Sequence, residues 1–261
     1  LVLGDKISAI AGDISGDSIN FGSKATVSDN AIFGNDLPDI AYDSNADKYV
    51  LVSKNNHTSN IISRVLTVSG TTITSGSEVN VFNLGSMDEP RIQYDPVNQK
   101  VVIVSQRSGG SKAIVGTVSG TSISFGSEVV FESAETITFE VVYDTSNDKI
   151  VIFYLDEDNS NYGTAIVGTV SGTSISFGTP VVFESSTTNP LAAVFDSTNN
   201  KILAGYRAGS TSKLIVGTVS GTSISFGSTT TFSSTQTYNQ SLAHDTSSGK
   251  NVLTYRDEGN S

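Results

Sequence analysis

Two carboxylates stand at equivalent positions of an internal repeat, where their type and spacing suit acid–base chemistry. Asp39 and Glu140 each precede by four residues an aspartate that recurs along the chain, Asp43 and Asp144 respectively. Glycoside hydrolysis needs such a pair, one carboxyl protonated and the other ionised. The unit between them carries Arg91 at the same position, so the carboxylate is not a constant feature of the repeat.

Further charged and aromatic side chains vary from unit to unit, whereas the framework residues recur. Guanidinium, carboxylate and phenol groups around a shallow mouth suit a polar ligand such as a sugar or an acidic group. The candidate ligand-binding residues are Asp39, Lys54, Arg91, Glu140, Tyr154, Tyr206, Arg207, Tyr255 and Arg256.

The recurring aspartates form the motif Asp-x4-Lys, and we interpret them as structural. An aspartate that begins a turn accepts hydrogen bonds from backbone N–H groups two or three residues later. Around a disc these carboxylates would lie too far apart to share one ion. With two histidines and no cysteine in the chain, we expect neither a metal nor a cofactor. The turn aspartates are Asp43, Asp95, Asp144, Asp196 and Asp245.

The spacings between these aspartates are 52, 49, 52 and 49 residues, and a Ser-Gly hairpin motif recurs with them. A fixed period near 50 residues indicates stacked supersecondary units. Within one unit, short β-rich runs alternate with turns, which predicts four antiparallel strands, A to D. Four antiparallel strands repeated around a ring make a β-propeller blade.

We therefore predict an all-β, five-bladed β-propeller that occupies residues 1–261 as a single domain. Strands A and B of the fifth blade lie at the C-terminus, and its strands C and D lie at the N-terminus. Pairing of these half-blades would close the ring and remove two exposed sheet edges; the alternative is an open piece of a larger propeller. The predicted blades are 38–82, 90–131, 139–183, 191–232, and 240–256 with 7–27.

Composition narrows the partners and the setting of the chain. A formal net charge of -11 argues against nucleic acid and anionic membranes as partners. The apolar residues, 37% of the chain, are dispersed, so no membrane-spanning segment is predicted. The final residues, from Tyr255 on, resemble the segment that starts at Tyr154, which lies in the middle of the third unit. We therefore expect the chain to be part of a longer protein.

The A–B and C–D turns are nearly uniform, whereas the B–C and D–A loops differ from blade to blade. Binding sites concentrate on variable loops that a rigid scaffold holds. We therefore predict a non-catalytic binding module, not an enzyme, that recognises a glycan or a cell-surface receptor through the B–C and D–A loops. The alternatives are a glycoside hydrolase-like propeller with central carboxylates and an architectural spacer of a fibre.

Three units contain the sequence Ile-Val-Gly-Thr-Val-Ser-Gly-Thr-Ser-Ile-Ser-Phe-Gly, starting at Ile114, Ile166 and Ile215. These units resemble repeats of uncharacterised marine phage tail-fibre and bacterial surface adhesin-like proteins. The resemblance implies a propeller displayed outside the cell or on a virion. It carries no catalytic residue over to this chain.

Overall fold

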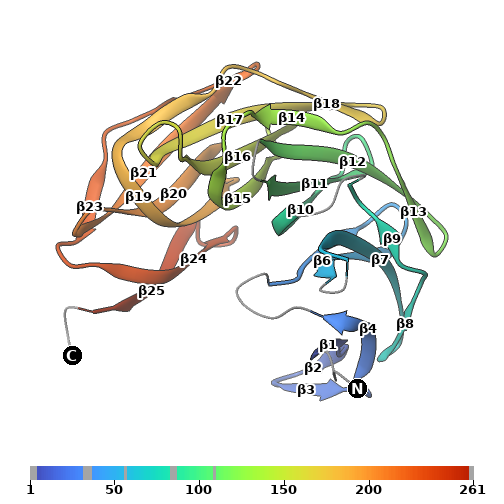
Figure 1. Ribbon diagram of the computed structural model, residues 1–261. Coiled ribbons are helices and arrows are strands. Elements are labelled where there is room, and N and C mark those ends of the chain that lie inside the picture. Colours follow the sequence, from blue (N-terminus) through green and yellow to red (C-terminus); the bar gives the residue numbers. More distant parts are fainter. Residues whose placement is uncertain (1–4, 32–36, 56–57, 83–86, 108–109, 259–261) are drawn as a thin grey trace. The chain divides into compact units, whose positions relative to one another are not determined.

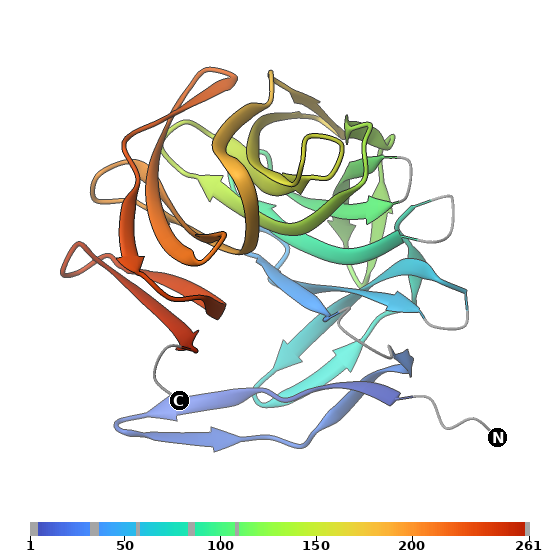
Figure 2. The ribbon, with the colours of Figure 1, turned by 60° about the vertical axis from the view of Figure 1, so that its left-hand side comes forward.

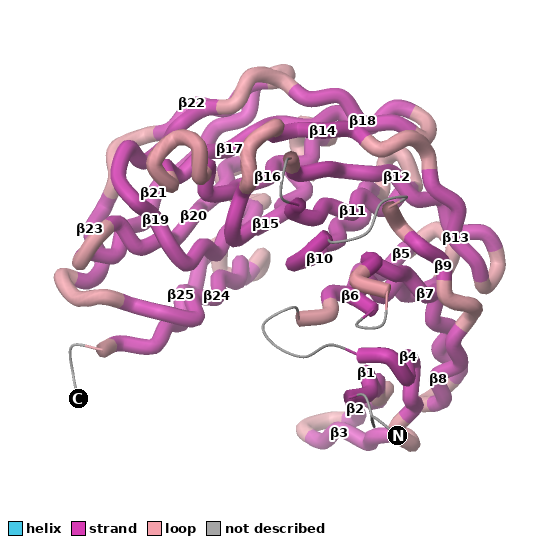
Figure 3. The backbone as a smooth tube through the Cα atoms, viewed as in Figure 1, coloured by secondary structure: helices cyan, strands magenta, loops and turns pink. Residues whose placement is uncertain are grey.

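The computed structural model of the chain is all-β, as predicted (Figure 1). Every helix or strand element in the described part of the chain is a strand (Figure 3), so that part contains no helix able to cross a membrane. The structure describes residues 5–31, 37–55, 58–82, 87–107 and 110–258. Segments of the predicted B–C and D–A loops, at 32–36, 56–57, 83–86 and 108–109, lie outside the described residues.

The strands belong to two compact units. The first comprises residues 1–108, 112–129 and 172–174, and the second comprises 109–111, 130–171 and 175–261.

The first unit contains two antiparallel meanders, β5-β6-β7-β8 and β10-β11-β12-β13, with β9 also paired to β7. Two further two-stranded sheets, β1-β4 and β2-β3, come from the N-terminal segment. The strand bounds are β1 Asp5–Ala9, β2 Gly12–Ser15, β3 Ser18–Phe21, β4 Ala25–Ala31, β5 Asp39–Asp43, β6 Lys48–Asn55, β7 Asn60–Ser69, β8 Thr72–Ser75, β9 Val79–Asn80, β10 Met87–Asp95, β11 Lys100–Arg107, β12 Ser111–Ser119 and β13 Ser122–Phe125.

The second unit continues the same meander in β15-β16-β17 and β19-β20-β21-β22, with β18 on β17 and β23 on β21, and ends in the hairpin β24-β25, red in Figure 2. The strand bounds are β14 Val129–Glu132, β15 Thr136–Asp144, β16 Lys149–Asp156, β17 Tyr162–Ser171, β18 Ser174–Phe177, β19 Val181–Asp196, β20 Lys201–Ala208, β21 Thr211–Ser220, β22 Ser223–Phe226, β23 Thr230–Ser233, β24 Thr237–Asp245 and β25 Lys250–Asp257.

One predicted loop is a strand instead. β19 runs without interruption through the expected D–A loop between the third and fourth blades. Its first part pairs with β17 and its second part pairs with β20. The connection is rich in Ser and Thr and contains no Gly, and the backbone N–H of Thr188 donates to the carbonyl of Asn161 at 3.1 Å. The β-branched Thr187 and Thr188 favour extended backbone at this point.

Each unit has its own hydrophobic core, to which the second strand of each meander contributes most. Val50 and Ile103 are buried in the first unit. In the second unit, Phe153, Phe183 and Phe226 form a cluster with ring centroids 5.5–6.2 Å apart. Aromatic pairs at such distances add to the stabilisation that burial provides.

The glycine that follows strand D marks a close approach between neighbouring hairpins. Its N–H donates to a strand C carbonyl, as from Gly178 to Val167 at 2.9 Å. A Cβ on Gly178 would overlap the carbonyl oxygen of Thr222, which follows the next hairpin glycine. The same overlap recurs at Gly22 with Thr71, at Gly76 with Thr121 and at Gly126 with Thr173. Glycine is needed here because only a residue without a Cβ lets the next hairpin approach.

Closure of the ring by the two half-blades is not seen. Among the described residues no sheet is closed and no strand pairing joins β24-β25 to β1-β4, so the structure does not establish five blades. The N-terminal hairpin therefore keeps apolar side chains exposed: Ile14 is 75% exposed and Phe21 60%.

We predict that Gly178→Ala destabilises the fold by about 1–3 kcal/mol, because its methyl group meets backbone and not a movable side chain. Chemical denaturation followed by circular dichroism measures the change. Ser176→Ala, at an exposed position of the same strand, is the control and should stay within about 0.5 kcal/mol of the wild type. Equal stability of the two variants would contradict the close approach.

Candidate functional site

The first unit holds Asp39, Lys54 and Arg91 in contacts with the protein itself. Both carboxylate oxygens of Asp39 accept backbone N–H groups, from Ile40 and from Ile92, at 2.9 Å each. Asp39 thus links β5 to β10. Lys54, at the end of β6, forms an ion pair with Asp88 of β10. Arg91 donates to the carbonyl of Pro90 at 3.0 Å.

Tyr154 and Tyr206, predicted to border a binding surface, are instead fully buried. Each lies in a second strand, and its hydroxyl donates to a carboxylate of the preceding D–A connection. Tyr154 donates to Glu132 at 3.1 Å, and Tyr206 donates to Glu184 at 3.3 Å. Burial, followed by the charge of the partner carboxylate, raises the pKa of both tyrosines. Both faces of β16 are covered in the folded chain, since Ile150 to Leu155 are all buried.

The two Glu–Tyr pairs differ in their surroundings. Burial alone would raise the pKa of Glu184, but hydrogen bonds from Lys213, Ser186 and Tyr206 lower it on balance. The Lys213 Nζ lies 2.7 Å from the Glu184 carboxylate. In the fourth blade, strand B (β20) is therefore linked to the preceding D–A connection by Glu184, whose charge is paired with Lys213.

At the third blade the Glu–Tyr pair meets a second carboxyl instead of a lysine. Asp156, the last residue of β16, is half-buried near Glu132. Burial and the charge of Glu132 raise the pKa of Asp156, against the lowering effect of a backbone N–H from Asn159. Glu132 is held in place by the Tyr154 hydroxyl and, at 3.1 Å, by the backbone N–H of Ala134. We call Glu132, Tyr154 and Asp156 the acidic site.

Arg207 and Arg256, equivalent residues of β20 and β25, converge on Tyr238 of β24. Their guanidinium carbons lie 4.5 and 4.7 Å from the centre of the Tyr238 ring. Tyr238 and Arg256 are directly opposite each other in the β24-β25 ladder. We call Arg207, Tyr238 and Arg256 the arginine site. The acidic and arginine sites lie near the ends of topologically equivalent strands, β16, β20 and β25.

The remaining predicted residues do not join either site. Glu140 is half-buried in β15, opposite Phe153 in the ladder with β16. Tyr255 is 41% exposed, and its ring packs on Phe232 with centroids 5.1 Å apart.

The turn aspartates bond to their own turns at the other end of the strands. In each turn one carboxylate oxygen accepts the backbone N–H groups two and three residues later, at 2.9–3.3 Å. Hydrogen bonds from Asn199 and Asn251 lower the pKa of Asp196 to about 2. Hydrogen bonds from Ser248 and Ser247 lower the pKa of Asp245.

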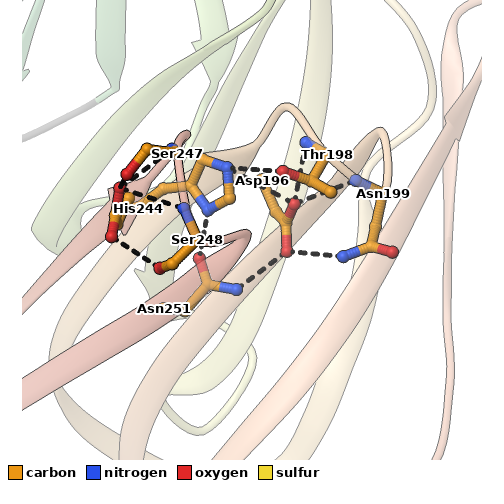
Figure 4. A network of polar contacts seen from close by, with 8 residues as sticks. Asp196, Thr198, Asn199, His244, Ser247, Ser248 and Asn251 are labelled. Carbon is orange, nitrogen blue, oxygen red and sulfur yellow. Dashed lines mark hydrogen bonds and ion pairs between the residues drawn. The ribbon is translucent and has the colours of Figure 1, made fainter.

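One of these turns is linked to the next blade by a polar network (Figure 4). Asn251 of β25 donates to Asp196 at 2.8 Å and contacts the Nδ1 of His244 at 3.1 Å. The Nε2 of His244 lies 3.3 Å from the Thr198 hydroxyl and 3.6 Å from the Asp196 carboxylate. The network joins β24-β25 to the turn between β19 and β20.

The described residues contain no group of three or more His, Cys, Asp or Glu arranged to hold a metal ion. The acidic and arginine sites depend on three residues that the sequence analysis did not select: Glu132, Asp156 as an acid, and Tyr238. A repeat signal was available for Glu132, because Glu184 stands 52 residues later, the spacing of Tyr154 and Tyr206.

No protein-family model and no curated protein matches the chain. Among solved structures, NanB with Optactamide matches at a TM-score of 0.52 and 12% identity, over 97% of this chain and 39% of that one. The exo-beta-1,3-galactanase of Phanerochaete chrysosporium with beta-1,3-galactotriose matches at 0.49 and 8% identity, over 86% and 54%. The chain therefore spans about half or less of the length of these proteins, and identities this low show a shared fold alone.

The comparisons correct the prediction of a non-catalytic module. The similar solved structures are β-propeller-like glycoside hydrolases. The sequence analysis preferred a binding module because the B–C and D–A loops vary on a constant framework, and it kept a glycoside hydrolase-like propeller as an alternative. The prediction that the chain is not an enzyme is contradicted, since the fold that it shares with NanB at 12% identity is found in a glycoside hydrolase.

We predict that in the Asn199→Ala variant the free energy of unfolding changes less with pH below pH 5 than it does in the wild type. The pKa of Asp196 is depressed, so its stabilising contribution is present above about pH 4 and is lost as the pH falls through about 2. The variant lacks the 3.0 Å bond from the Asn199 amide. Its deficit in unfolding free energy relative to wild type should therefore shrink from pH 5 to pH 2.

Urea denaturation at successive pH values measures this deficit. Ser197→Ala, at an exposed position of the same turn, is the control and should show no such trend. A deficit that stays constant down to pH 2 would show that Asn199 does not act through the Asp196 carboxylate.

Proposed function

We propose that the chain is a glycoside hydrolase-like β-propeller whose chemistry is performed at the acidic site. The observation that carries the proposal is the neighbouring carboxyl pair Glu132 and Asp156, in which burial and the partner's charge favour the protonated form of Asp156. Two carboxyls whose environments differ in this way can divide acid and base roles between them. The shared fold of the similar solved structures is consistent with this class of activity.

In the proposed reaction Asp156 is the acid and Glu132 is its partner. Asp156 donates its proton to the glycosidic oxygen as the bond from that oxygen to the anomeric carbon breaks. According to the separation of the two carboxyls, Glu132 either takes a proton from the attacking water or attacks the anomeric carbon itself; in the second case Asp156 then takes a proton from the water that breaks the bond between the sugar and Glu132. The bonds from Tyr154 and Ala134 fix the orientation of Glu132 during this step.

The central pair suggested by the sequence, Asp39 and Glu140, is less suitable. Both oxygens of Asp39 accept backbone N–H groups, so this carboxylate has a structural task in linking β5 to β10. Glu140 belongs to the other compact unit.

We predict that Asp156→Asn lowers kcat about 10²–10⁴-fold, the usual contribution of a general acid. Release of reducing ends from a panel of neutral and acidic polysaccharides identifies the substrate and measures kcat. The matched control is Glu157→Gln, an exposed carboxyl one residue away, which should retain wild-type activity. No hydrolysis across the panel, or full activity of Asp156→Asn, would contradict the proposal; loss with Glu140→Gln alone would move the acid to β15.

The pH dependence gives a second measure of the same acid. Activity should fall as the pH rises through the raised pKa of Asp156, because the protonated form is the active one. The charge of Asp158 also raises this pKa. Asp158→Asn should therefore shift the fall to lower pH and leave the maximal rate nearly unchanged.

We also propose that the propeller has five blades, with β24 and β25 completing the blade that β1 to β4 begin. The repeat supports this proposal. In the other blades the residue seven after the turn aspartate pairs with the residue five before the hairpin glycine, as Val102 with Val115 and Leu203 with Val216. The same rule pairs Val252 with Ala11.

We predict that the variant carrying Ala11→Cys and Val252→Cys forms an intramolecular disulfide on oxidation. Residues directly opposite in an antiparallel ladder have Cα atoms about 4.5–5.5 Å apart, within the range for a disulfide. The chain has no other cysteine, so mobility on a non-reducing gel and thiol titration are unambiguous. A control pair, Ile14→Cys with Val252→Cys, should remain reduced. Exclusively intermolecular disulfides would contradict closure within one chain.

Binding to a glycan at a cell or virion surface stays a prediction. So does the relation to tail-fibre and adhesin repeats. They are compatible with a hydrolase, since an acidic chain without cysteine places no limit on that setting.

A further inference from the structure

The arginine site concentrates positive charge in a chain that is otherwise strongly acidic. The chain has five arginines and a net charge of -11, yet two of the five contact the same ring. Two like charges that share one ring repel each other, and the tyrosine ring offsets only part of that cost. The arrangement therefore calls for a compensating anion.

The first unit provides an internal comparison at equivalent positions. Lys54 occupies the place of Arg207 in its blade, and Asp88 occupies the place of Tyr238, seven residues before the turn aspartate. There the cation forms an ion pair with the carboxylate of the next blade. At the arginine site the carboxylate is replaced by Tyr238, and a second cation, Arg256, is added.

The protein neutralises the arginine site only in part. Arg256 pairs with Glu258 at 2.8 Å, but the two side chains are 57% and 48% exposed, and ion pairs of this kind are weak. The Nη1 of Arg207 is buried without a hydrogen-bond acceptor among the described residues. The Tyr238 hydroxyl donates to Gln236 at 2.8 Å and is thus turned to a neutral partner.

We infer that the arginine site is a subsite for a carboxylate group on the glycan, which makes the substrate an acidic polysaccharide. This inference rests on the proposed function, because it names the class of substrate that would be hydrolysed at the acidic site. A guanidinium group binds a carboxylate through two parallel hydrogen bonds, and the Arg207 Nη1 is a donor without a partner at this site in the described part of the chain. The negative charge of the rest of the chain confines attraction of an acidic polymer to this place.

Binding of an oligogalacturonate hexamer, compared with the same hexamer fully methyl-esterified, tests the inference. Isothermal titration calorimetry is carried out on the Asp156→Asn variant, so that hydrolysis does not interfere. We expect the acid to bind at least 10-fold more tightly than the ester, and this preference to weaken with added salt.

Arg207→Gln should abolish the preference, and Arg207→Lys should restore only part of it, because lysine keeps the charge but not the planar pair of donors. The matched control is Arg64→Gln, which removes the same charge from an arginine that pairs with Glu78 at 2.9 Å in the first unit. Thermal melts establish that each variant is folded.

Equal affinity for acid and ester, binding of neither, or an equal loss in Arg207→Gln and Arg64→Gln would overturn the inference. These outcomes are distinct from failure of the proposed function. Hydrolysis of neutral glycans without any preference for acidic ones would support the proposed hydrolysis at the acidic site and contradict the carboxylate subsite. Selective binding of the acidic hexamer without hydrolysis would support the carboxylate subsite and contradict the proposed hydrolysis.

Discussion

The close approach of each hairpin to the glycine of the preceding blade is the constraint on which the repeat depends. A four-stranded meander exposes a face and an edge, and it becomes stable only when a neighbour covers them. The glycines at 22, 76, 126 and 178 bring the backbone of the next hairpin into contact. This docking keeps successive blades in one register, so equivalent residues of neighbouring blades meet repeatedly.

The consequences of that register can be followed along the strands. At the turn end, the residue before the turn aspartate meets the preceding blade in two cases: the backbone N–H of Asn45 donates to the Tyr94 hydroxyl, and His244 contacts Thr198. At the other end, strand B of one blade meets the start of strand A of the next, as Lys54 meets Asp88 and Arg207 meets Tyr238. At the turn end the same set of hydrogen bonds recurs in every blade, whereas at the other end the residue types differ from blade to blade.

This division explains how near-identical blades can carry distinct sites. Glu132 and Glu184 make the same bond to a buried tyrosine, so the bond itself is a structural device of the fold. What differs is the third group: Lys213 neutralises Glu184, whereas Asp156 lies near Glu132 and acquires a raised pKa. Two differences around a repeated bond thus change its electrostatic surroundings: Asp156 stands where the fourth blade has Ala208, and Thr164 faces Tyr154 where Lys213 faces Tyr206.

The sequence by itself determined the all-β class, the positions of the turns and the bonding pattern of the turn aspartates. These features are local: a hairpin glycine such as Gly120, with φ of 60°, and an aspartate that accepts N–H groups two and three residues later depend on neighbours in the chain. The tertiary structure alone decided the rest. Tyr154 and Tyr206 were expected at a surface but are buried, because the folded chain covers their strands; beside Tyr154, Phe153 and Leu155 on the opposite face are buried as well. Tyr238 and Arg256 face each other within the β24-β25 hairpin, but Arg207 joins them from β20 because of the docking of neighbouring blades. That last contact is a property of packing between blades and not of any spacing within one.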